Sequence, residues 1–306
     1  MRTVISPDSE AFLANISRVQ RSVQEAGRQA SSGKRINVAS DAPDQIDAIL
    51  QLRSNLVRNA QIQSNLGLAK TNADAADSAL SSAVKMLDRA LVLGAQGSTF
   101  TLNAAGRQGL AIEVQGLQDQ MLAISRTAVQ GRFIFSGDQD SGPSYEQDLT
   151  APNGVTRLLN VNSTRRMEDP AGGSFAVDQS AQQIFDARNA DDTLAPGNVF
   201  AALNSLRVAL LNNDPSQIAA ATGSIKTASD HLNSAQGFYG AMQNRIQDAT
   251  SYGASYDVQL KTELSSHVDA DVSAAAMAMT QGNTQLQAAF QMQAKMPRTS
   301  LFDFLG

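Results

Sequence analysis

The sequence FLANISRVQRSVQEAGRQA, residues 12–30, carries its apolar side chains at alternating steps of four and three. These side chains are Phe12, Ile16, Val19, Val23, Ala26 and Ala30. Such spacing is the heptad pattern of a helix that packs along one stripe against another helix. The pattern predicts a helix over roughly residues 8–31, with this stripe, here called a seam, turned toward a partner helix.

A second, longer helix is expected to begin near Asp41. Ser40 or Asp41 can cap free backbone N–H groups there, and Pro43 suits the first helical turn. Its seam turns polar at Asn59 and Gln63 and then resumes over residues 73–94. The heptad pattern therefore predicts one continuous helix with a polar interruption.

A third helix follows the heptad positions from Leu110 to Ala128. It is expected to end at Gly131, because glycine readily takes the left-handed conformation of a helix cap. The turn before this helix is short and contains glycine and asparagine. The second and third helices are therefore predicted to form an antiparallel hairpin.

The periodicity changes after Gly131. Alternation in residues 132–136 and clusters of turn-forming residues up to about Asp192 predict a small β-rich insertion. A short helix is expected over Val199–Leu211, and Asp214 with the following proline is expected to start the last helical region. That region keeps the heptad nearly to the end of the chain, before Pro297.

These elements predict a mainly α fold, an elongated rod of long coiled-coil helices from both termini with a small β-rich outer insertion. A helix of about 45 residues would be nearly 70 Å long. The expected parts are terminal helices at 1–40 and 265–306, a helical rod domain at 41–130 and 199–264, and the insertion at 131–198.

The two terminal segments are expected to form an assembly interface through their seams. In the last segment the seam residues are Val268, Val272, Ala275, Met279, Leu286 and Ala289. Small seam residues bury little apolar area, and each Å² buried stabilises the helix by only about 25 cal/mol. Ordering the backbone costs ~1–2 kcal/mol of conformational entropy per residue. We therefore expect both ends to be disordered in a free monomer and helical only when neighbouring subunits cover them.

Composition argues against several classes of function. The net charge of -5 gives no electrostatic footprint for nucleic acid, and the absence of cysteine excludes disulfides and thiolate chemistry. No apolar run has the length of a membrane span, and no cleavable signal peptide is recognisable. One cluster has residue types that can bind a metal, but we interpret it as a solvated helix face: Glu263, His267, Asp269 and Asp271. Because the chain has only two histidines, we expect no histidine-based catalytic site, and no enzyme activity, metal or cofactor.

The segment ASSGKRINVASDAP, residues 30–43, resembles the N-terminal signature of the bacterial flagellin group. Its characteristic positions are Ser32, Gly33, Lys34, Arg35, Ser40, Asp41 and Pro43. The heptad helices on either side and the C-terminal sequence LFDFL, residues 301–305, agree with that group. The resemblance covers roughly residues 5–140 and 200–306.

Within that group the chain is more similar to the flagellin-like hook-filament junction proteins than to filament flagellins. The segment Ser40–Pro43 resembles the Ser-Asp-Asp-Pro sequence of the junction proteins, although Ala42 replaces the second aspartate. The sequence GRFIFSG, residues 131–137, also favours the junction proteins, and its marked positions are Gly131, Phe133, Phe135 and Gly137.

The resemblance implies a structural junction subunit of the bacterial flagellum, secreted without a cleaved signal peptide. Its implied partners are copies of itself, neighbouring hook-associated protein and flagellin subunits, and a cytoplasmic export chaperone. Leu301, Phe302, Phe304 and Leu305 are the candidate chaperone or export residues. Two alternatives stay open: filament flagellin, and a soluble coiled-coil adaptor of a different functional class.

Overall fold

The computed structural model describes residues 7–159 and 163–295, and the chain divides into two compact units. Unit 1 comprises Met1–Arg58 and Tyr256–Gly306, and unit 2 comprises Asn59–Ser255. Helices predominate, and strands within the described ranges form only two-stranded hairpins. None of the described helices combines the length and apolar character that a membrane span requires.

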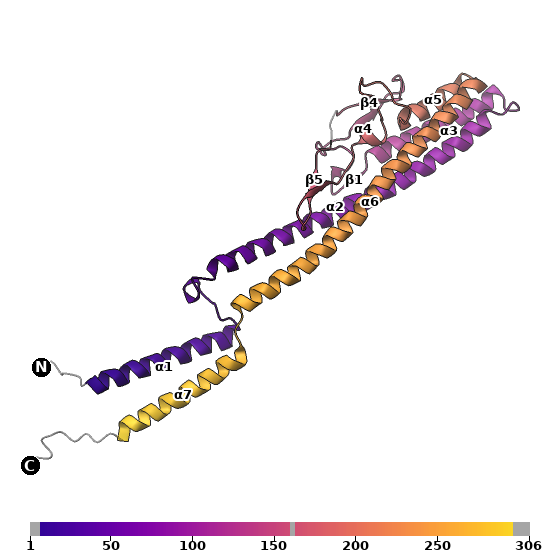
Figure 1. The fold of residues 1–306 in the computed structure, drawn as a ribbon. Helices are drawn as coiled ribbons and strands as arrows, with labels where there is room; N and C mark the ends of the chain where they lie inside the picture. The colour runs from indigo at the N-terminus through magenta and orange to yellow at the C-terminus, as the bar shows by residue number, and fades with distance from the viewer. Residues whose placement is uncertain (1–6, 160–162, 296–306) are drawn as a thin grey trace, which may run out of the picture. The chain divides into compact units, whose positions relative to one another are not determined.

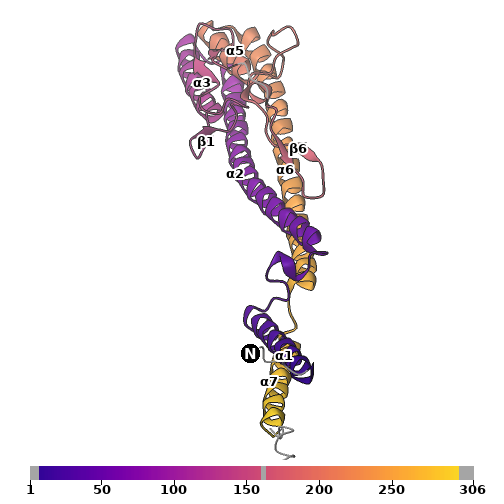
Figure 2. The same cartoon turned by 90° about the vertical axis from the view of Figure 1, so that its left-hand side faces the viewer.

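Unit 2 is built on the larger parts of two long antiparallel helices, residues 59–97 of α2 (Ile46–Gly97) and residues 215–255 of α6 (Pro215–Val268), which lie side by side in Figures 1 and 2. Their heptad positions are buried against each other, and glutamine side chains of α6 bond aspartates of α2 beside the seam: Gln236 to Asp77 at 3.1 Å and Gln243 to Asp74 at 2.9 Å. The predicted coiled-coil seam is therefore the core of this unit.

The predicted hairpin of the second and third helices is confirmed. α3 (Ala104–Ser125) begins at the Asn103 cap, and its Glu113 pairs with Arg89 of α2. The buried Arg107 guanidinium donates to the carbonyls of Gly97 and Thr99 at 2.7 and 2.9 Å. Because Gly97 is the last residue of α2, Arg107 satisfies a carbonyl that the helix end leaves unpaired.

The short helix α5 (Val199–Leu211) has the predicted bounds and packs against α3. The helix α6 starts at Pro215, where the Asp214 carboxylate accepts the backbone N–H groups of Ser216 and Gln217. Both helix starts agree with the sequence-based prediction, because the capping residues are local to each helix.

Around the insertion, the described residues form three antiparallel hairpins and one short helix, and the first hairpin begins just before residue 131. β1 (Ala128–Val129) pairs with β2 (Arg132–Phe133), β3 (Tyr145–Gln147) with β4 (Val155–Arg157), and β5 (Arg166–Glu168) with β6 (Ser174–Ala176). The helix is α4 (Ala181–Ile184). The prediction of a small β-rich insertion is confirmed, with strands of only two or three residues.

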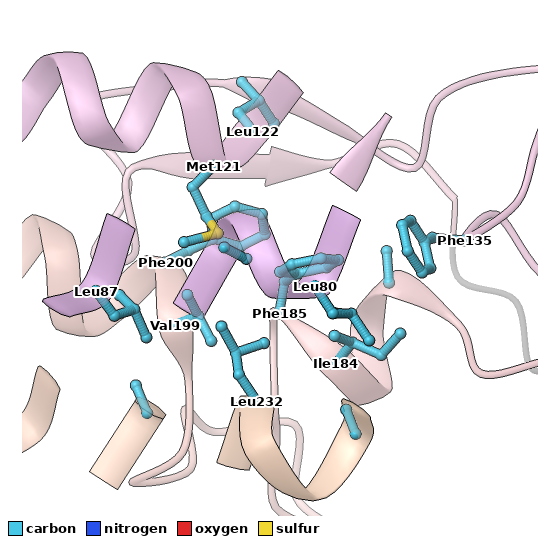
Figure 3. Close-up of a cluster of buried hydrophobic side chains, with 14 of the residues drawn as sticks. Leu80, Leu87, Met121, Leu122, Phe135, Ile184, Phe185, Val199, Phe200 and Leu232 are labelled. Carbon is cyan, nitrogen blue, oxygen red and sulfur yellow. The ribbon is translucent and has the colours of Figure 1, made fainter. Parts of the chain in front are cut away.

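An aromatic cluster joins the insertion to the helices. Phe135 meets Phe185 edge-on, with ring centroids 5.5 Å apart, and Tyr239 of α6 at 6.4 Å. Figure 3 shows Phe135, Phe185 and Ile184 turned toward Leu80 of α2. The insertion thus shares one hydrophobic core with the helices.

A buried carboxylate also fixes the insertion. Asp186 is 0% exposed and accepts hydrogen bonds from the Tyr145 hydroxyl (3.0 Å), the amides of Asn153 (3.0 Å) and Asn198 (2.7 Å), and Arg188 Nε (2.8 Å). The four donors satisfy both carboxylate oxygens, which a buried charge requires.

The predicted end of the third helix at Gly131 is wrong. α3 ends at Ser125, and the Arg126 side chain donates to the Tyr145 carbonyl at 2.7 Å, which turns the chain toward β3. Gly131 and Gln130, with φ of 78° and 52°, form the turn between β1 and β2 instead. The left-handed conformation expected of Gly131 is present, but it closes a hairpin.

The predicted start of the second helix near Asp41 is also wrong. Residues Ala39–Asp41 form a 3₁₀ turn, and α2 starts only at Ile46. The Asp41 carboxylate accepts the backbone N–H groups of Asn37 and Val38, at 2.9 and 3.0 Å. It therefore caps the turn before it rather than the helix after it.

Unit 1 holds the two terminal helices α1 (Pro7–Ser32) and α7 (Val272–Lys295), which pack along each other (Figure 1). The heptad suggests continuity from α6 into α7, but the chain breaks the helix between Val268 and Val272. Leu301, Phe302, Phe304, Leu305 and Pro297 lie outside the described residues.

Candidate assembly site

The pair of helices α1 and α7 is antiparallel and closely spaced. A Cβ built on Gly27 of α1 would lie 3.9 Å from Met279 Sδ, and one built on Gly282 of α7 would lie 3.8 Å from Val19 and would collide with Val23. Small residues at these positions let the two backbones approach. The absence of a side chain at Gly282 is therefore a requirement of the pair as it is packed.

The structure places most predicted seam residues between these helices. Ile16, Ala26 and Ala275 are buried there, whereas Val268 is buried at the end of α6 against Ile36, Ala42 and Ile49. A second group is half-buried and consists of Phe12, Val19, Val23, Met279, Leu286 and Ala289. Val272 is exposed, because it lies at the first residue of α7, where the chain leaves the break.

Outside its contact with α1, the surface of α7 is uncharged and exposes large apolar side chains, a feature that the heptad pattern does not predict. Met277, Phe290 and Met292 are 67%, 54% and 66% exposed. No charged residue occurs from Val272 to Ala294, whereas α1 carries three arginines and three acids. An exposed helix face of this kind is typical of a surface that a partner protein covers.

A backbone clasp connects the loop after α1 to the break between α6 and α7. We call the segments Gly33–Ile36 and His267–Ala270 the clasp. The N–H of Arg35 donates to the Val268 carbonyl at 2.7 Å, and the N–H of Ala270 donates to the Gly33 carbonyl at 3.0 Å. Gly33 has φ of 67°, a left-handed conformation that favours glycine. The predicted motif residue Gly33 thus allows the chain to leave α1 and reach the opposite segment.

Side chains reinforce the clasp around Gln45. Arg35 Nη2 donates to the His267 carbonyl at 2.7 Å and to Gln45 Oε1 at 3.3 Å, and His267 Nδ1 lies 3.4 Å from the same oxygen. Behind them a small core consists of Ile36, Ala42, Ile49 and Val268. Gln45 was not among the predicted residues, because a lone glutamine before a helix gives no recognisable pattern.

The remaining residues of the first motif shape the loop. The Ser32 hydroxyl oxygen accepts a hydrogen bond from the backbone N–H of Lys34. The side chains of Lys34, Ser40 and Pro43 are exposed. The backbone N–H groups of Val38 and Asn37 hold the pKa of Asp41 below its usual value. The carboxylate therefore stays charged and keeps this turn closed at neutral pH.

The second motif, Gly131–Gly137, lies in unit 2 and has a packing role. Phe133 is half-buried, Phe135 is fully buried in the aromatic cluster, and Gly131 and Gly137 both have positive φ. The two motifs are thus parts of different units, and the structure does not bring them into one site.

Two family models match this arrangement of terminal helices. The bacterial flagellin N-terminal helical region matches residues 8–140, and the bacterial flagellin C-terminal helical region matches residues 222–305. Together they cover well over half of the chain. The chain belongs to the bacterial flagellin family. The resemblance predicted from residues 30–43 is confirmed.

Relatives of this flagellin-family chain include hook-associated proteins. Flagellar hook-associated protein 3 of Escherichia coli is 24% identical over 90% of both chains. Flagellin B of Rhizobium meliloti is 25% identical over 69% of this chain and 54% of its own length. Flagellar hook-associated protein-3 of Legionella pneumophila has the same fold, with a TM-score of 0.61, 16% identity and coverage of 72% of this chain and 98% of that one.

The flagellin family is one of structural flagellar proteins. A cavity of about 440 Å³ in unit 2 is lined by Phe133, Ile134, Arg165, Asp178 and Tyr239 among others. Its Arg165 pairs with Asp140 at 2.9 Å. Within residues 7–159 and 163–295, no three His, Cys, Asp or Glu side chains converge on a metal-sized site.

Proposed function

We propose that this chain is the structural subunit that joins the flagellar hook to the filament, and that it acts by shape rather than by catalysis. The similarity to hook-associated protein 3 of Escherichia coli extends over 90% of both chains, which supports the junction role. The likeness to flagellin B covers a smaller share of both chains. The segments Ser40–Pro43 and Gly131–Gly137 favour the same choice.

One observation carries the proposal: α7 exposes large apolar side chains and carries no charge from Val272 to Ala294. Met277, Phe290 and Met292 would stay in water in an isolated chain. Burying them against neighbouring subunits contributes about 25 cal/mol per Å² of apolar surface. We therefore assign the terminal helices, 1–40 and 265–306, to an inner assembly layer that becomes ordered when subunits meet.

The other parts of the chain have matching roles in this proposal. The helical domain, 41–130 and 199–264, supports the subunit, and the insertion, 131–198, faces outward. Partners are further copies of the chain together with hook-associated and flagellin subunits. Export occurs without a cleaved signal peptide, and a cytoplasmic chaperone holds Leu301, Phe302, Phe304 and Leu305 before export.

Filament flagellin is the competing function within the family. A filament subunit polymerises alone into long fibres from short seeds, whereas a junction subunit occupies one position and does not. Incubating the purified chain with seeds of itself separates the two functions. Long fibres in electron micrographs would contradict the junction role.

Deleting the gene tests the proposal in the cell. We expect hooks of normal length without filaments, and flagellin released into the medium. Reintroducing the full chain should restore filaments. Normal filaments in the deletion strain would overturn the junction function, and loss of hooks would place the subunit earlier in assembly.

A further inference from the structure

One polar side chain interrupts the seam of α2 within unit 2. Every fully buried side chain of α2 is apolar except Asn59, which is 2% exposed. Its Nδ2 donates to the Gly253 carbonyl of α6 at 2.9 Å. Its Oδ1 has no hydrogen-bond partner among the described residues. A buried amide oxygen without a partner destabilises the folded chain, so Asn59 is not there to strengthen the core.

The residue opposite Asn59 is equally specific. A Cβ on Gly253 would lie 3.3 Å from Asn59 Oδ1 and 3.2 Å from Gln63 Nε2, closer than side chains normally pack. Gly253 is in the interior of α6, where glycine is less favourable than alanine. Asn59 and Gly253, which each destabilise the helix pair, therefore face each other, and a side chain at position 253 would crowd Asn59.

The pair also marks a change in the heptad pattern. On α2 the inward positions step by three from Leu56 to Asn59 and again by three to Ile62, after which steps of four and three alternate. On α6 the alternation continues without a change through Ala249 to Gly253. An extra step of three locally overwinds a coiled coil. A specific contact is therefore needed here to fix the register in which α2 pairs with α6.

The rest of this seam discriminates poorly between partners. Many of its buried positions are alanine, including Ala69, Ala73 and Ala76 on α2, and Ala235 and Ala249 on α6. Interchangeable small residues allow several registers and several partners of similar energy. In an assembly of identical chains, such a seam would also accept α6 of another chain.

We propose that Asn59 and Gly253 form a pairing lock, which makes α2 pair with α6 of its own chain and in one register. A shift by one heptad would place Asn59 opposite Ile246 or Leu260. A large apolar side chain at the opposite position would keep Asn59 Nδ2 from reaching a backbone carbonyl of α6, so both polar atoms of Asn59 would lack a partner. A single buried asparagine fixes register in coiled coils in the same way, at the expense of stability.

The absence of cysteine allows a direct test of partner choice. Asp74 and Gln243 are hydrogen-bonded across the helix pair, so the double substitution Asp74→Cys, Gln243→Cys places two thiols within reach of a short bismaleimide cross-linker in the native pairing. This protein is unfolded, refolded at high concentration and cross-linked. Denaturing electrophoresis then separates cross-links within one chain from cross-links between two chains. With Asn59 present, we expect nearly all cross-links within one chain.

Adding Asn59→Leu should raise the fraction of cross-linked dimers about tenfold, equivalent to about 1.4 kcal/mol of lost preference. The melting temperature should not fall, because the unpaired amide is removed. Asn55→Leu is the matched control, since Asn55 is exposed on the same helix. Asn59→Ala repeats the test without a larger side chain if Asn59→Leu does not fold. An unchanged dimer fraction in the Asn59 variants, or an equal rise with Asn55→Leu, would overturn the lock.

Discussion

Gly282 of α7 and Val23 of α1 touch so closely that a Cβ on the glycine would overlap the valine Cγ2. Gly282→Val should therefore separate the terminal helices. Overpacking destabilises by about 1–3 kcal/mol, which exceeds the gain of about 1 kcal/mol or less from removing a helical glycine. We expect a strain with this variant to lose most of its filaments, as counted by electron microscopy.

Gly223→Val is the control for this change. Gly223 is also helical, but a Cβ there meets no atom within 4 Å. This strain should keep its filaments, and equal loss in both strains would show that the effect is not specific to the α1–α7 contact.

The clasp predicts a difference between arginine and lysine at Arg35. Its Nη2 donates to both the His267 carbonyl and Gln45 Oε1, and the lysine side chain is one bond shorter, so its ammonium does not reach the same position. Arg35→Lys keeps the charge and should loosen the clasp by about 1 kcal/mol. In the assembled state, where the terminal segments are ordered, amide exchange at Ala270 should become roughly five- to tenfold faster. Arg53→Lys, on an exposed position of α2, should leave it unchanged.

The uncharged face of α7 predicts that a single charge blocks assembly. Met277→Glu introduces a carboxylate on a side chain that is exposed in the single chain, so the fold of the monomer should not change. If a neighbouring subunit covers this face, burying the charge is unfavourable by several kcal/mol. We expect motility in soft agar to be lost. Gln24→Glu on the already charged α1 should remain motile, and a motile Met277→Glu strain would contradict the proposed interface.

Local patterns predicted the helices, and long-range contacts explain the errors. Val199–Leu211 was predictable because its caps and its period lie within the segment. The break after Val268 was not, because the heptad continues across it. The bond from the Arg35 N–H to the Val268 carbonyl joins residues more than 200 positions apart. Gly131 and Asp41 had the expected conformational and capping chemistry, but that chemistry serves a hairpin and the preceding turn.

The candidate site was predictable in part for the same reason. The seam positions follow from periodicity, and Gly33 follows from the family motif. Gln45 and Asp186 have no local signal, since their partners come from distant segments: His267 for Gln45, and Tyr145 for Asp186. The lack of charge between Val272 and Ala294 is visible in the sequence, but which apolar side chains of α7 stay exposed depends on its packing against α1.

Asp186 predicts a large loss of stability from a small change. Asp186→Asn places an NH₂ group among four donors, so at least two hydrogen bonds are lost and one contact becomes repulsive. Breaking a buried charge pair destabilises by about 3–5 kcal/mol. Urea unfolding followed by circular dichroism should show this loss. Asp230→Asn, at an exposed position of α6, should change the unfolding free energy by less than about 0.5 kcal/mol.

Tyr145 makes the stability depend on alkaline pH. Burial, and then the Asp186 carboxylate, raise the pKa of Tyr145 well above the usual value of about 10. Burial likewise raises the pKa of Tyr239. Above pH ~10 the unfolded chain loses these protons while the folded chain keeps them. The unfolding free energy is therefore unaffected by these groups below pH ~10 and falls above it, by up to about 1.4 kcal/mol per pH unit for each tyrosine.

Tyr145→Phe separates this titration from the hydrogen bond that the hydroxyl donates to Asp186. At neutral pH the variant should be less stable by about 1 kcal/mol or more, because Asp186 loses one donor. Above pH ~10 its unfolding free energy should fall less steeply than that of the wild type, because the variant keeps the raised pKa of Tyr239 but lacks that of Tyr145. Urea titrations at several values between about pH 9 and 11 measure both effects, and an unchanged slope would show that Tyr145 ionises as readily in the folded chain as in the unfolded one.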